Sequence, residues 1–394
     1  MMHPTQQVTS SIELLSSSGK VNSVDETLQT RLLLELEQAQ DLCRSSHIKQ
    51  LIVNSLPPGS DLQEVPPIAE FLPSDITPFE AEHIINGMQK FWYPGISSKY
   101  IRINANGERF YLSLSSYWPA LLQGVAGVLK SRQSSSQSSN EICLYGLQPC
   151  VRPEKQENQW RRLAFTQAHL DFVSWHQDHM TMCRKAIECI CRAVTQLTGL
   201  SAQNIRVRVS DARGWPSLLG SHFSPRTIQA LRKHLLDPIS AAVALHNGDT
   251  HLLAQRAARF LRRLSRDQVS DELLRIVIRW IETGDYELEN GMDLDNFRCA
   301  EVHRLVHSCK EMGINAIVDA RSARIGYSGL TWQVDCYVNE CWIEVAGGGD
   351  YTDAAILYAR LHSNVSYDPT TIVVGSAVGV HRALAIGLDT GTAD

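Results

Sequence analysis

The pattern of hydrophobic and polar residues predicts a chain built from both helices and strands. Leucines recur at helical spacing over residues 25 to about 51, which predicts one amphipathic helix or two. Apolar runs with β-character predict strands over residues 142–151 and 205–210. Further along the chain, two β-rich runs predict a hairpin with Asn339 and Glu340 at its turn.

The first 67 residues differ in composition from the rest of the chain. Residues 1–24 are polar and rich in Ser, Thr and Gln, which predicts a mobile tail. Prolines at positions 57, 58, 66 and 67 then mark a linker. Residues 1–67 are therefore interpreted as a tail and a helical leader. The leader either docks on the core or on a dimer face, or it serves as an added partner-binding or substrate-binding element.

Residues 215–310 are predicted to be mostly helical, and they contain the one local basic cluster of the chain. It consists of Arg256, Arg259, Arg262, Arg263 and Arg266. Such a run is either a solvated helix face or a surface that meets the phosphates of an acceptor nucleic acid. The net charge of −5 provides no bulk attraction to nucleic acid.

Cysteine usage and hydropathy point to a cytoplasmic protein. Ten cysteines are scattered without a framework of short paired spacings, which is typical of reduced thiols. No apolar run approaches the roughly 18 residues that span a bilayer, and the N-terminus lacks the layout of a signal peptide. We therefore expect no membrane partner.

Histidines and cysteines gather after residue 168, and their spacing decides how they are interpreted. The spacing does not fit a zinc finger or zinc ribbon, and the cysteines fall among Ile and Ala on a helix face that is predicted to be buried. Core packing is therefore preferred to metal binding for this set: His169, His176, His179, Cys183, Cys189 and Cys191.

The stretch with most candidate chemistry follows the strand that ends near residue 151. Arg152 and Glu154 are two residues apart, so on an extended chain both side chains lie on one face. Arginine forks match the geometry of phosphate and carboxylate groups, and an aromatic ring can stack on a base. The loop and the returning strand supply such groups: Arg161, Arg162 and Phe165. The hairpin is thus suited to a polyphosphate and a base.

This layout resembles motif 2 of the class II aminoacyl-tRNA synthetases, and other stretches resemble the same family. Residues 373–388, VVGSAVGVHRALAIGL, are similar to motif 3, in which a glycine-rich strand end leads into a helix that starts with an arginine. Residues 342–355, WIEVAGGGDYTDAA, resemble the glycine-rich strand and loop of histidyl-tRNA synthetases. Residues 68–92, with a helix expected over 78–92, resemble the N-terminal part of that subgroup. The matches occur in the family's order and cover roughly residues 68–390.

The resemblance implies an α+β fold: a class II synthetase-type antiparallel sheet flanked by helices, with a helical insertion and the N-terminal helical leader. The expected division is 1–67 for tail and leader, 68–214 for the first part of the core, 215–310 for the insertion and 311–394 for the second part. Because the chain stops soon after motif 3, we expect no C-terminal anticodon-binding domain. The resemblance also implies a homodimer through motif 1, whose strand is expected over residues 99–103, although Asn104 replaces its usual proline.

The resemblance further implies that ATP lies on the sheet and that the protein forms an acyl-adenylate, chiefly by positioning and electrostatics. Arg152 would bridge the substrate carboxylate and the α-phosphate, and Glu154 would face the adenine amino group. The remaining ATP contacts would come from Arg161 or Arg162 on the outer phosphates, Phe165 on adenine and Arg382 on the γ-phosphate.

On the amino-acid side, the family positions that hold the substrate amino group match Gln167 and Asp171. Tyr327 corresponds to one tyrosine of the histidine-binding motif. The tight run Gly347, Gly348 and Gly349 would let a substrate approach the backbone closely. Ser115 and Ser116 stand where histidyl-tRNA synthetases carry an acidic residue that reads the imidazole. A hydroxyl cannot replace that carboxylate without loss of charge-assisted bonding, so a substrate other than histidine is expected.

One family residue has no direct counterpart. The catalytic arginine of the histidine-binding motif falls near Ser322, flanked by Arg321 and Arg324, and either could serve after a small register change. Alternatively, Asp335 and Glu344 hold Mg²⁺, for which hard oxygen ligands are suited, or they pair structurally within the hairpin.

Three functions remain open from the sequence. The preferred one is ATP-dependent activation of an amino acid or related carboxylic acid, followed by transfer to a small-molecule amine or a carrier thiol. The second is a tRNA-charging enzyme of reduced size. The third is a non-catalytic regulatory subunit, like the histidyl-tRNA synthetase paralogue that partners ATP phosphoribosyltransferase. Those paralogues have lost the ATP-binding arginines, whereas this chain has Arg152, Glu154 and Arg382.

Overall fold

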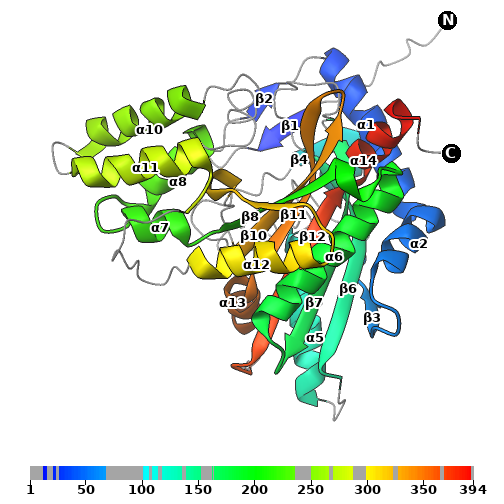
Figure 1. Ribbon diagram of the computed structural model, residues 1–394. Coiled ribbons are helices and arrows are strands. Elements are labelled where there is room, and N and C mark those ends of the chain that lie inside the picture. Colours follow the sequence, from blue (N-terminus) through cyan, green and yellow to red (C-terminus); the bar gives the residue numbers. More distant parts are fainter. Residues whose placement is uncertain are drawn as a thin grey trace, which may run out of the picture.

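An eight-stranded sheet forms the centre of the molecule in the computed structural model (Figure 1). The structure describes residues 12–15, 21–23, 26–67, 101–105, 109–113, 118–134, 139–151, 162, 164–235, 250–265, 269–286, 299–322, 327–363 and 368–391. In spatial order the strands are β3 (Leu62–Glu64), β6 (Glu141–Val151), β7 (Ala164–Trp175), β12 (Thr371–Gly379), β11 (Cys341–Asp350), β10 (Leu330–Val338), β8 (Ile205–Asp211) and β9 (Ala316–Val318).

The inner strands, from β6 to β8, are all antiparallel, which confirms the expected type of sheet. The short edge strands β3 and β9 run parallel to their neighbours. The expected hairpin is β10–β11, and its turn is formed by Asn339 and Glu340, which have φ angles of 50° and 63°. Two left-handed residues in succession are what a two-residue hairpin turn requires, so the predicted turn is confirmed.

One face of the sheet is apolar and is covered by helices. Side chains such as Leu170, Phe172 and Val374 are fully buried beneath α6 (His179–Thr198) and α14 (Val380–Asp389), and α12 (Cys299–Glu311) covers β8 and β9. Helix α6 begins where the Asp178 carboxylate accepts a hydrogen bond from the Thr181 N–H at 2.8 Å, a normal N-cap. Each fully buried aliphatic side chain on this face stabilises the fold by about 1.5–3 kcal/mol.

The opposite face is apolar over only part of its area. There, α5 (Trp118–Ser134) and α13 (Thr352–Ser363) pack on Leu144 and Val373 through residues such as Leu121 and Ala355. The rest of this face, toward β11, β10 and β8, is lined by polar side chains and glycines. Because a sheet face without apolar side chains gains little from burial, this polar area is a candidate for function.

The leader docks on the core, which confirms the first of its two interpretations. It forms α1 (Glu26–Arg44), which lies against β6 and β7, and α2 (Ser46–Ser55), which packs on α6 through the buried Ile48 and Ile52. Ser45 separates the two helices, because its side chain accepts a hydrogen bond from the Ile48 N–H and starts the second one.

Two expectations for residues 1–67 were wrong. The stretch expected to be a linker contributes β3, which pairs with β6 through the backbone. Part of the tail expected to be mobile forms β1 (Ile12–Leu15) and β2 (Val21–Ser23). These strands join β4 (Ile101–Ala105), which was expected near residues 99–103, and β5 (Arg109–Ser113) in a four-stranded sheet. The helix predicted over residues 78–92 lies outside the described residues.

The helical insertion forms a lobe beside the sheet (Figure 1). It contains α7 (Gly214–Leu219), α8 (Pro225–Leu235), α10 (Thr250–Ser265) and α11 (Asp271–Thr283). The indole of Trp280 meets the rings of Trp215 and Tyr286 edge to face, with centroid distances of 5.2 and 4.8 Å. These aromatic contacts belong to the same buried cluster as the apolar face of the sheet, so the lobe is packed onto the main core. None of the described helices is long and apolar enough to cross a membrane.

Candidate functional site

Strand register gathers several of the predicted residues on the polar face of the sheet. Residues that pair directly across neighbouring strands point to the same face, and residues two apart on one strand do too. Asp171 pairs with Gly375, which pairs with Gly349, which in turn pairs with Thr331. By the same rule the face also carries Gln167, His169, Gly347, Gln333, Asp335 and Glu344. Gln167 and Asp171 of the returning motif 2 strand therefore lie on the same face as Gly347 and Gly349 of the glycine-rich hairpin.

Asp171 is completely buried and its two carboxylate oxygens are both hydrogen-bonded. Oδ1 accepts a hydrogen bond from the Tyr351 hydroxyl at 2.8 Å, and Oδ2 lies 2.7 Å from Nδ1 of His169. Burial raises the pKa of the Asp171 carboxyl, and the hydrogen bonds from His169 and Tyr351 counteract that rise. A Cβ atom at Gly375 would overlap this carboxylate, so the site depends on a glycine there. A contact between Asp171 and a substrate amino group remains a prediction.

His169 is therefore part of a buried polar pair. The described residues contain no group of three or more His, Cys, Asp or Glu side chains that could hold a metal ion. Cys183 and Cys189 are buried in the main core on α6, as the core-packing interpretation predicted.

The three glycines of β11 have different surroundings. Gly348 faces the apolar side, where a Cβ would lie 2.7 Å from Nε1 of Trp332. Gly349 faces the polar side, where a Cβ would lie 2.6 Å from Cδ1 of Tyr327. At both positions glycine makes room for a side chain of the protein itself. Among the three, Gly347 and Gly349 share the polar face, and Tyr327 lies directly against it.

Asp335 is held by two arginines of β8. Its Oδ2 accepts hydrogen bonds from Nη2 of Arg206 at 2.8 Å and from Nε of Arg208 at 2.7 Å, while Oδ1 accepts from Nη2 of Arg208 at 2.8 Å. Arg208 also reaches Glu344 at 3.6 Å and Asp319 at 3.3 Å. A magnesium ion needs carboxylate lone pairs that these guanidinium groups already occupy. The donor set at Asp335 and Glu344 therefore does not fit the ion.

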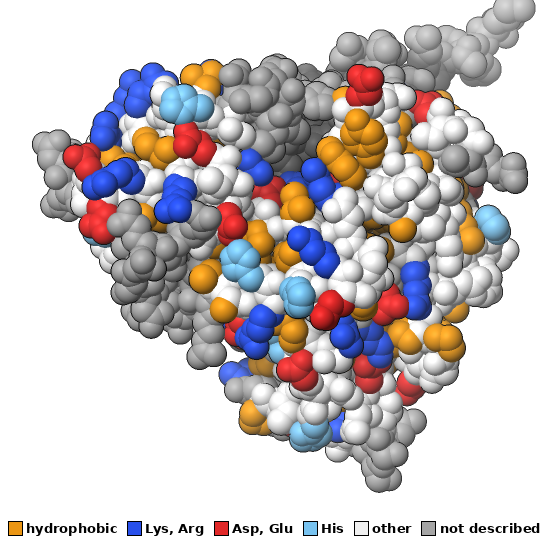
Figure 2. All heavy atoms as spheres, viewed as in Figure 1, with side chains coloured by type: hydrophobic (Ala, Val, Ile, Leu, Met, Phe, Trp, Pro, Cys, Tyr) orange, Lys and Arg blue, Asp and Glu red, His pale blue; other side chains and the backbone are white. Residues whose placement is uncertain are grey.

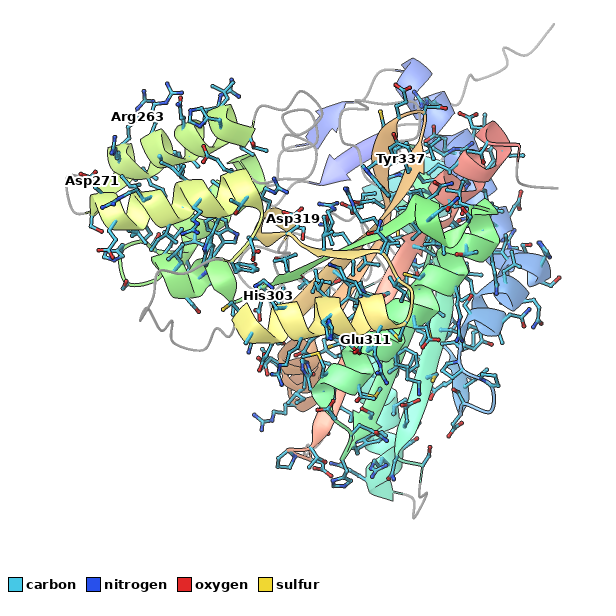
Figure 3. The ribbon with its side chains drawn as sticks, viewed as in Figure 1. Arg263, Asp271, His303, Glu311, Asp319 and Tyr337 are labelled. Atoms are coloured by element: carbon cyan, nitrogen blue, oxygen red, sulfur yellow. The ribbon has the colours of Figure 1, made fainter. Side chains whose placement is uncertain are left out.

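Arg321, one of the two candidates for the missing family arginine, points toward the insertion. Its Nε donates to Oδ1 of Asp319 at 2.6 Å, and its Nη1 lies 3.4 Å from the Ile281 carbonyl oxygen of α11. Asp319 lies between the helical lobe and the sheet (Figure 3). Burial would raise the pKa of its carboxyl, but Arg321 and Arg208 outweigh burial and hold that pKa below its usual value.

Ser322, where the family arginine was expected, is buried beside the sheet. Its hydroxyl donates to the Asp319 carbonyl at 2.8 Å, and its own carbonyl accepts a hydrogen bond from Nε2 of Gln333 at 3.2 Å. The other candidate, Arg324, lies outside the described residues, as do Arg152, Glu154, Arg161 and Ser116. Their roles remain predictions.

The first turn of α14 fills the gap where β7 and β11 extend beyond the end of β12. Thr166 of β7 donates its N–H to Nδ1 of His381 at 3.0 Å. Arg382 donates from Nη1 to the Glu344 carbonyl of β11 at 2.6 Å. The helix begins at Val380, two residues before the arginine that was expected to start it. The two strands thus fix the backbone turn that carries Arg382.

Arg162 of the motif 2 hairpin lies near the same turn. Burial and the positive charge of Arg162 together lower the pKa of His381 to about 4. The guanidinium of Arg162 is hydrogen-bonded to α1, because its Nη1 donates to Oε1 of Gln38 at 2.6 Å. Phe165, the predicted stacking residue, is half-buried on the neighbouring part of β7. The guanidinium group of Arg382 could neutralise phosphate oxygens at this end of the polar face.

The leader supplies contacts at this end that sequence reasoning missed. On α1, Glu35 accepts the backbone N–H of Ala164 at 3.1 Å, and the Ala39 carbonyl accepts the Thr166 hydroxyl at 2.8 Å. Gln38 accepts a hydrogen bond from Nη1 of Arg162 at 2.6 Å. The available signal was a glutamate among the leucines of an amphipathic helix, because a carboxylate on such a face needs a partner.

The arrangement of strands defines the class of fold. An antiparallel sheet with a motif 2-like hairpin, a glycine-rich hairpin strand and a final strand–helix unit is the class II aminoacyl-tRNA synthetase fold.

Solved structures of histidyl-type proteins with this fold resemble the chain over most of its length. A histidine–tRNA ligase subunit from Alicyclobacillus acidocaldarius has a TM-score of 0.50 and 15% identity, with 93% of each chain covered. A histidyl-tRNA synthetase from Nostoc sp. PCC 7120 has a TM-score of 0.54 and 12% identity, covering 95% of this chain and 77% of that one.

A third structure comes from Bacillus halodurans and is described as an ATP phosphoribosyltransferase regulatory subunit/histidyl-tRNA synthetase. It has a TM-score of 0.51 and 12% identity, covering 98% of this chain and 84% of that one. No protein-family model matches the sequence, and no curated protein is detectably similar to it. At such low identities the likeness concerns the fold.

Proposed function

We propose that this protein uses ATP to activate an amino acid or a related carboxylic acid as an acyl-adenylate and then transfers the acyl group to an acceptor other than tRNA. The observation that carries the proposal is the polar, glycine-containing sheet face, at one end of which Arg382 is held against β11. ATP-derived phosphates and a carboxylate are the ligands that such a cationic end of a polar surface suits.

The chemistry needs positioning and charge neutralisation more than acid–base groups. A substrate carboxylate oxygen attacks the α-phosphorus, and the bond from that phosphorus to the bridging β-oxygen breaks, so pyrophosphate leaves. Arg382 and Arg162 would neutralise charge on the outer phosphates, and Arg152 would align carboxylate and α-phosphate. An amine or thiolate acceptor then attacks the acyl carbon, and AMP leaves.

Two sequence features support an acceptor other than tRNA. Ser115 and Ser116 replace the acidic reader of histidine, and the net charge of −5 gives no bulk attraction to nucleic acid. The acceptor would be a small amine or a carrier thiol. We further propose a homodimer in the cytoplasm; all ten cysteines are free thiols, which suits a reducing compartment.

The basic surface of the insertion favours a second candidate, a tRNA-charging enzyme of reduced size. Helix α10 exposes Arg256, Arg259 and Arg263, and Arg275 is exposed on α11. Figure 2 shows Lys and Arg side chains gathered over this lobe. Arg263 and Asp271 lie near the outer end of its helices, far from the sheet (Figure 3). Such a surface could meet phosphates of a nucleic acid.

The internal ion pairs favour a third candidate, a non-catalytic regulatory subunit. Asp335 is occupied by Arg206 and Arg208, and Arg321 is occupied by Asp319, so these charges serve the fold. In this reading the polar face keeps the architecture of an ATP site and binds no nucleotide.

ATP–pyrophosphate exchange against a panel of amino acids separates the three candidates. We expect exchange with one acid or a small group of acids, and no dependence on tRNA. Aminoacylation of added tRNA at a rate comparable to that of pyrophosphate exchange would favour the second candidate. No exchange with any acid, from folded protein that also fails to bind ATP, would favour the third.

The Arg382→Ala variant tests the site itself. We expect exchange to fall by about 10²–10³-fold, because a charge-neutralising donor is lost at the reacting phosphates. The matched control is Arg192→Ala, which removes an exposed arginine that pairs with Glu188 on α6. A folded Arg382→Ala protein that exchanges at the wild-type rate would refute the site assignment.

A further inference from the structure

Two buried polar atoms on the polar face have no partner within the described part of the protein. Among the described buried side chains, Oγ1 of Thr331 and Oε1 of Gln333 make no hydrogen bond. Both residues lie on β10, two positions apart on the same face, and they are 0% and 1% exposed. Buried polar groups in folded proteins are nearly always hydrogen-bonded, so a neighbouring pair of exceptions needs an explanation.

The orientation of the Gln333 amide is fixed by its other end. Nε2 donates to the Ser322 carbonyl oxygen at 3.2 Å. The reversed amide would place two acceptor oxygens against each other, so this assignment does not depend on a choice between equivalent orientations. Oε1 is therefore the atom that lacks a partner, and it can only accept a hydrogen bond.

The strands on either side place these atoms beside the predicted substrate contacts. Gln333 pairs with Gly347 of β11, and Thr331 pairs with Gly349, against which Tyr327 packs. Gly347 has no side chain, so the residue paired with Gln333 on β11 offers no side-chain hydrogen bond to Oε1. The two atoms therefore lie next to the glycine-rich strand that is predicted to contact the substrate.

The charges near this pair are compensated among themselves. On the β8 side, Gln333 is next to Arg208, whose guanidinium is bonded to Asp335 and Asp319. Arg206 is likewise bonded to Asp335. These described charges are already paired with one another, so none of them is available to balance an ionised ligand group. A neutral group that donates one hydrogen bond and accepts another would satisfy both Oε1 of Gln333 and Oγ1 of Thr331.

We propose that Thr331 and Gln333 form a specificity subsite for a carboxamide on the activated acid, with the carboxamide N–H donating to Oε1 of Gln333 and its carbonyl accepting from the Thr331 hydroxyl. This inference rests on the proposed function. It identifies the substrate class as an amino acid with an amide side chain, such as glutamine or asparagine.

The first test compares substrates on the wild-type protein. Glutamine and asparagine should support pyrophosphate exchange at least about 10²-fold better than glutamate, aspartate or norleucine, because a site built to hydrogen-bond a group rejects analogues that leave its polar atoms unpaired. Exchange that favours an ionised or apolar acid over both amides would overturn the subsite while leaving activation intact.

The second test uses the isosteric variant Thr331→Val. We expect an equal or higher melting temperature, because an unpaired buried hydroxyl is removed, together with a KM for the amide substrate that rises about 10-fold or more. A merely structural threonine would change stability alone. An unchanged KM would therefore contradict the proposal, and it would indicate that the hydroxyl is satisfied in another way, for example by water.

The matched control is Thr371→Val. Thr371 lies on β12 at the opposite end of the same face, and its hydroxyl is also buried without a partner among the described residues. The same chemical change there should affect stability in the same direction and leave KM unchanged. A KM that rises equally in both variants would show a general effect on the sheet and overturn the assignment.

Binding separates failure of the subsite from failure of the proposed function. Calorimetric titration of the full chain with glutamine and with asparagine needs no turnover. Binding that Thr331→Val weakens, in a protein that shows no exchange with any acid, would support the subsite and refute activation. Exchange without amide binding would do the reverse, and the absence of both would refute both.

Discussion

Arg208 shows how a single residue can make a predicted magnesium site, at Asp335 and Glu344, unsuitable for the ion. It contacts three carboxylates, on Asp335, Asp319 and Glu344, and thereby joins β10, β11 and the segment that comes after β9. Burial disfavours the charged guanidinium, but these carboxylates more than compensate and raise the pKa of Arg208. Two of its partners are themselves buried, so they depend on this arginine for compensation.

Replacing Arg208 with methionine should therefore be strongly destabilising. The substitution removes one of the arginines that contact each of two buried carboxylates. Asp319 would keep only Arg321, and Asp335 would keep only Arg206. We expect a loss of about 3–5 kcal/mol in the free energy of unfolding, measured by urea denaturation. The control Arg192→Met breaks an exposed pair on α6 and should change stability by less than about 1 kcal/mol. Equal effects of the two variants would contradict this account of the network.

At the scale of elements, the leader helix α1 completes a sheet edge that the strands leave open. Beyond the end of β12, the edge of β7 has no neighbouring strand among the described residues, and its pairing with β12 stops at Gln167. Glu35 and the Ala39 carbonyl of α1, together with His381 of α14, accept hydrogen bonds from Ala164 and Thr166 there. Two helices from opposite ends of the chain thus replace a strand.

This account predicts a local effect of Glu35→Ala. The Ala164 N–H would be left buried without an acceptor, so the protein should lose about 1–3 kcal/mol, and hydrogen exchange at that amide should become faster. Glu35→Gln keeps an acceptor oxygen and should be much milder. The control is Glu37→Ala, because Glu37 is exposed on the same helix. Unaltered exchange at Ala164 in folded Glu35→Ala would show that the edge does not depend on α1.

At the scale of the whole molecule, the dependence of stability on pH combines several buried groups. The pKa of His381 falls to about 4, so between pH 6.5 and 4 the unfolded chain binds a proton that the folded protein does not. Its stabilising contribution is complete above pH 6.5 and is lost as the pH falls through that range. The hydrogen bond from the Thr166 N–H changes stability with pH in the same direction, because Nδ1 of His381 must be unprotonated to accept it.

The ion pair between His179 and Asp350 also makes stability depend on pH, through both of its members. The hydrogen bond with Asp350 raises the pKa of His179 against the effect of burial. Burial would raise the pKa of Asp350, but His179 and the hydrogen bonds from Thr352 together outweigh burial and lower that pKa. The stability from His179 is present below pH 6.5 and is lost as the pH rises through its folded pKa. The stability from Asp350 is present above about pH 4 and is lost as the pH falls below that.

We therefore predict that His381→Gln flattens the acid side of the stability curve. Glutamine can still accept from Thr166 through its amide oxygen, but it does not titrate. Wild-type protein should lose up to about 3 kcal/mol between pH 6.5 and 4 that the variant keeps, as measured by urea denaturation at a series of pH values. Parallel curves for the two proteins would show that His381 is not the group responsible.

The sequence by itself determined the elements and much of their order. The periodicity of the leucines gave the leader helices, the β-rich runs gave the hairpin strands, and the Asn339–Glu340 turn was identifiable because its flanking runs were apolar. Motifs also indicated the class of fold and placed Arg382 beside a strand end. These features are local, so the order of residues along the chain is enough to predict them.

Only the tertiary structure decided which side chains are committed to partners. Arg208 and Asp335 are 127 residues apart in sequence, and Glu35 and Ala164 are 129 apart. Pairs at such separations meet only through strand order and register, which no local pattern encodes. The same limit explains why Gly348 turned out to face the apolar side and why the orphan oxygen of Gln333 could not be foreseen: a one-residue difference in register reverses the face on which a side chain lies.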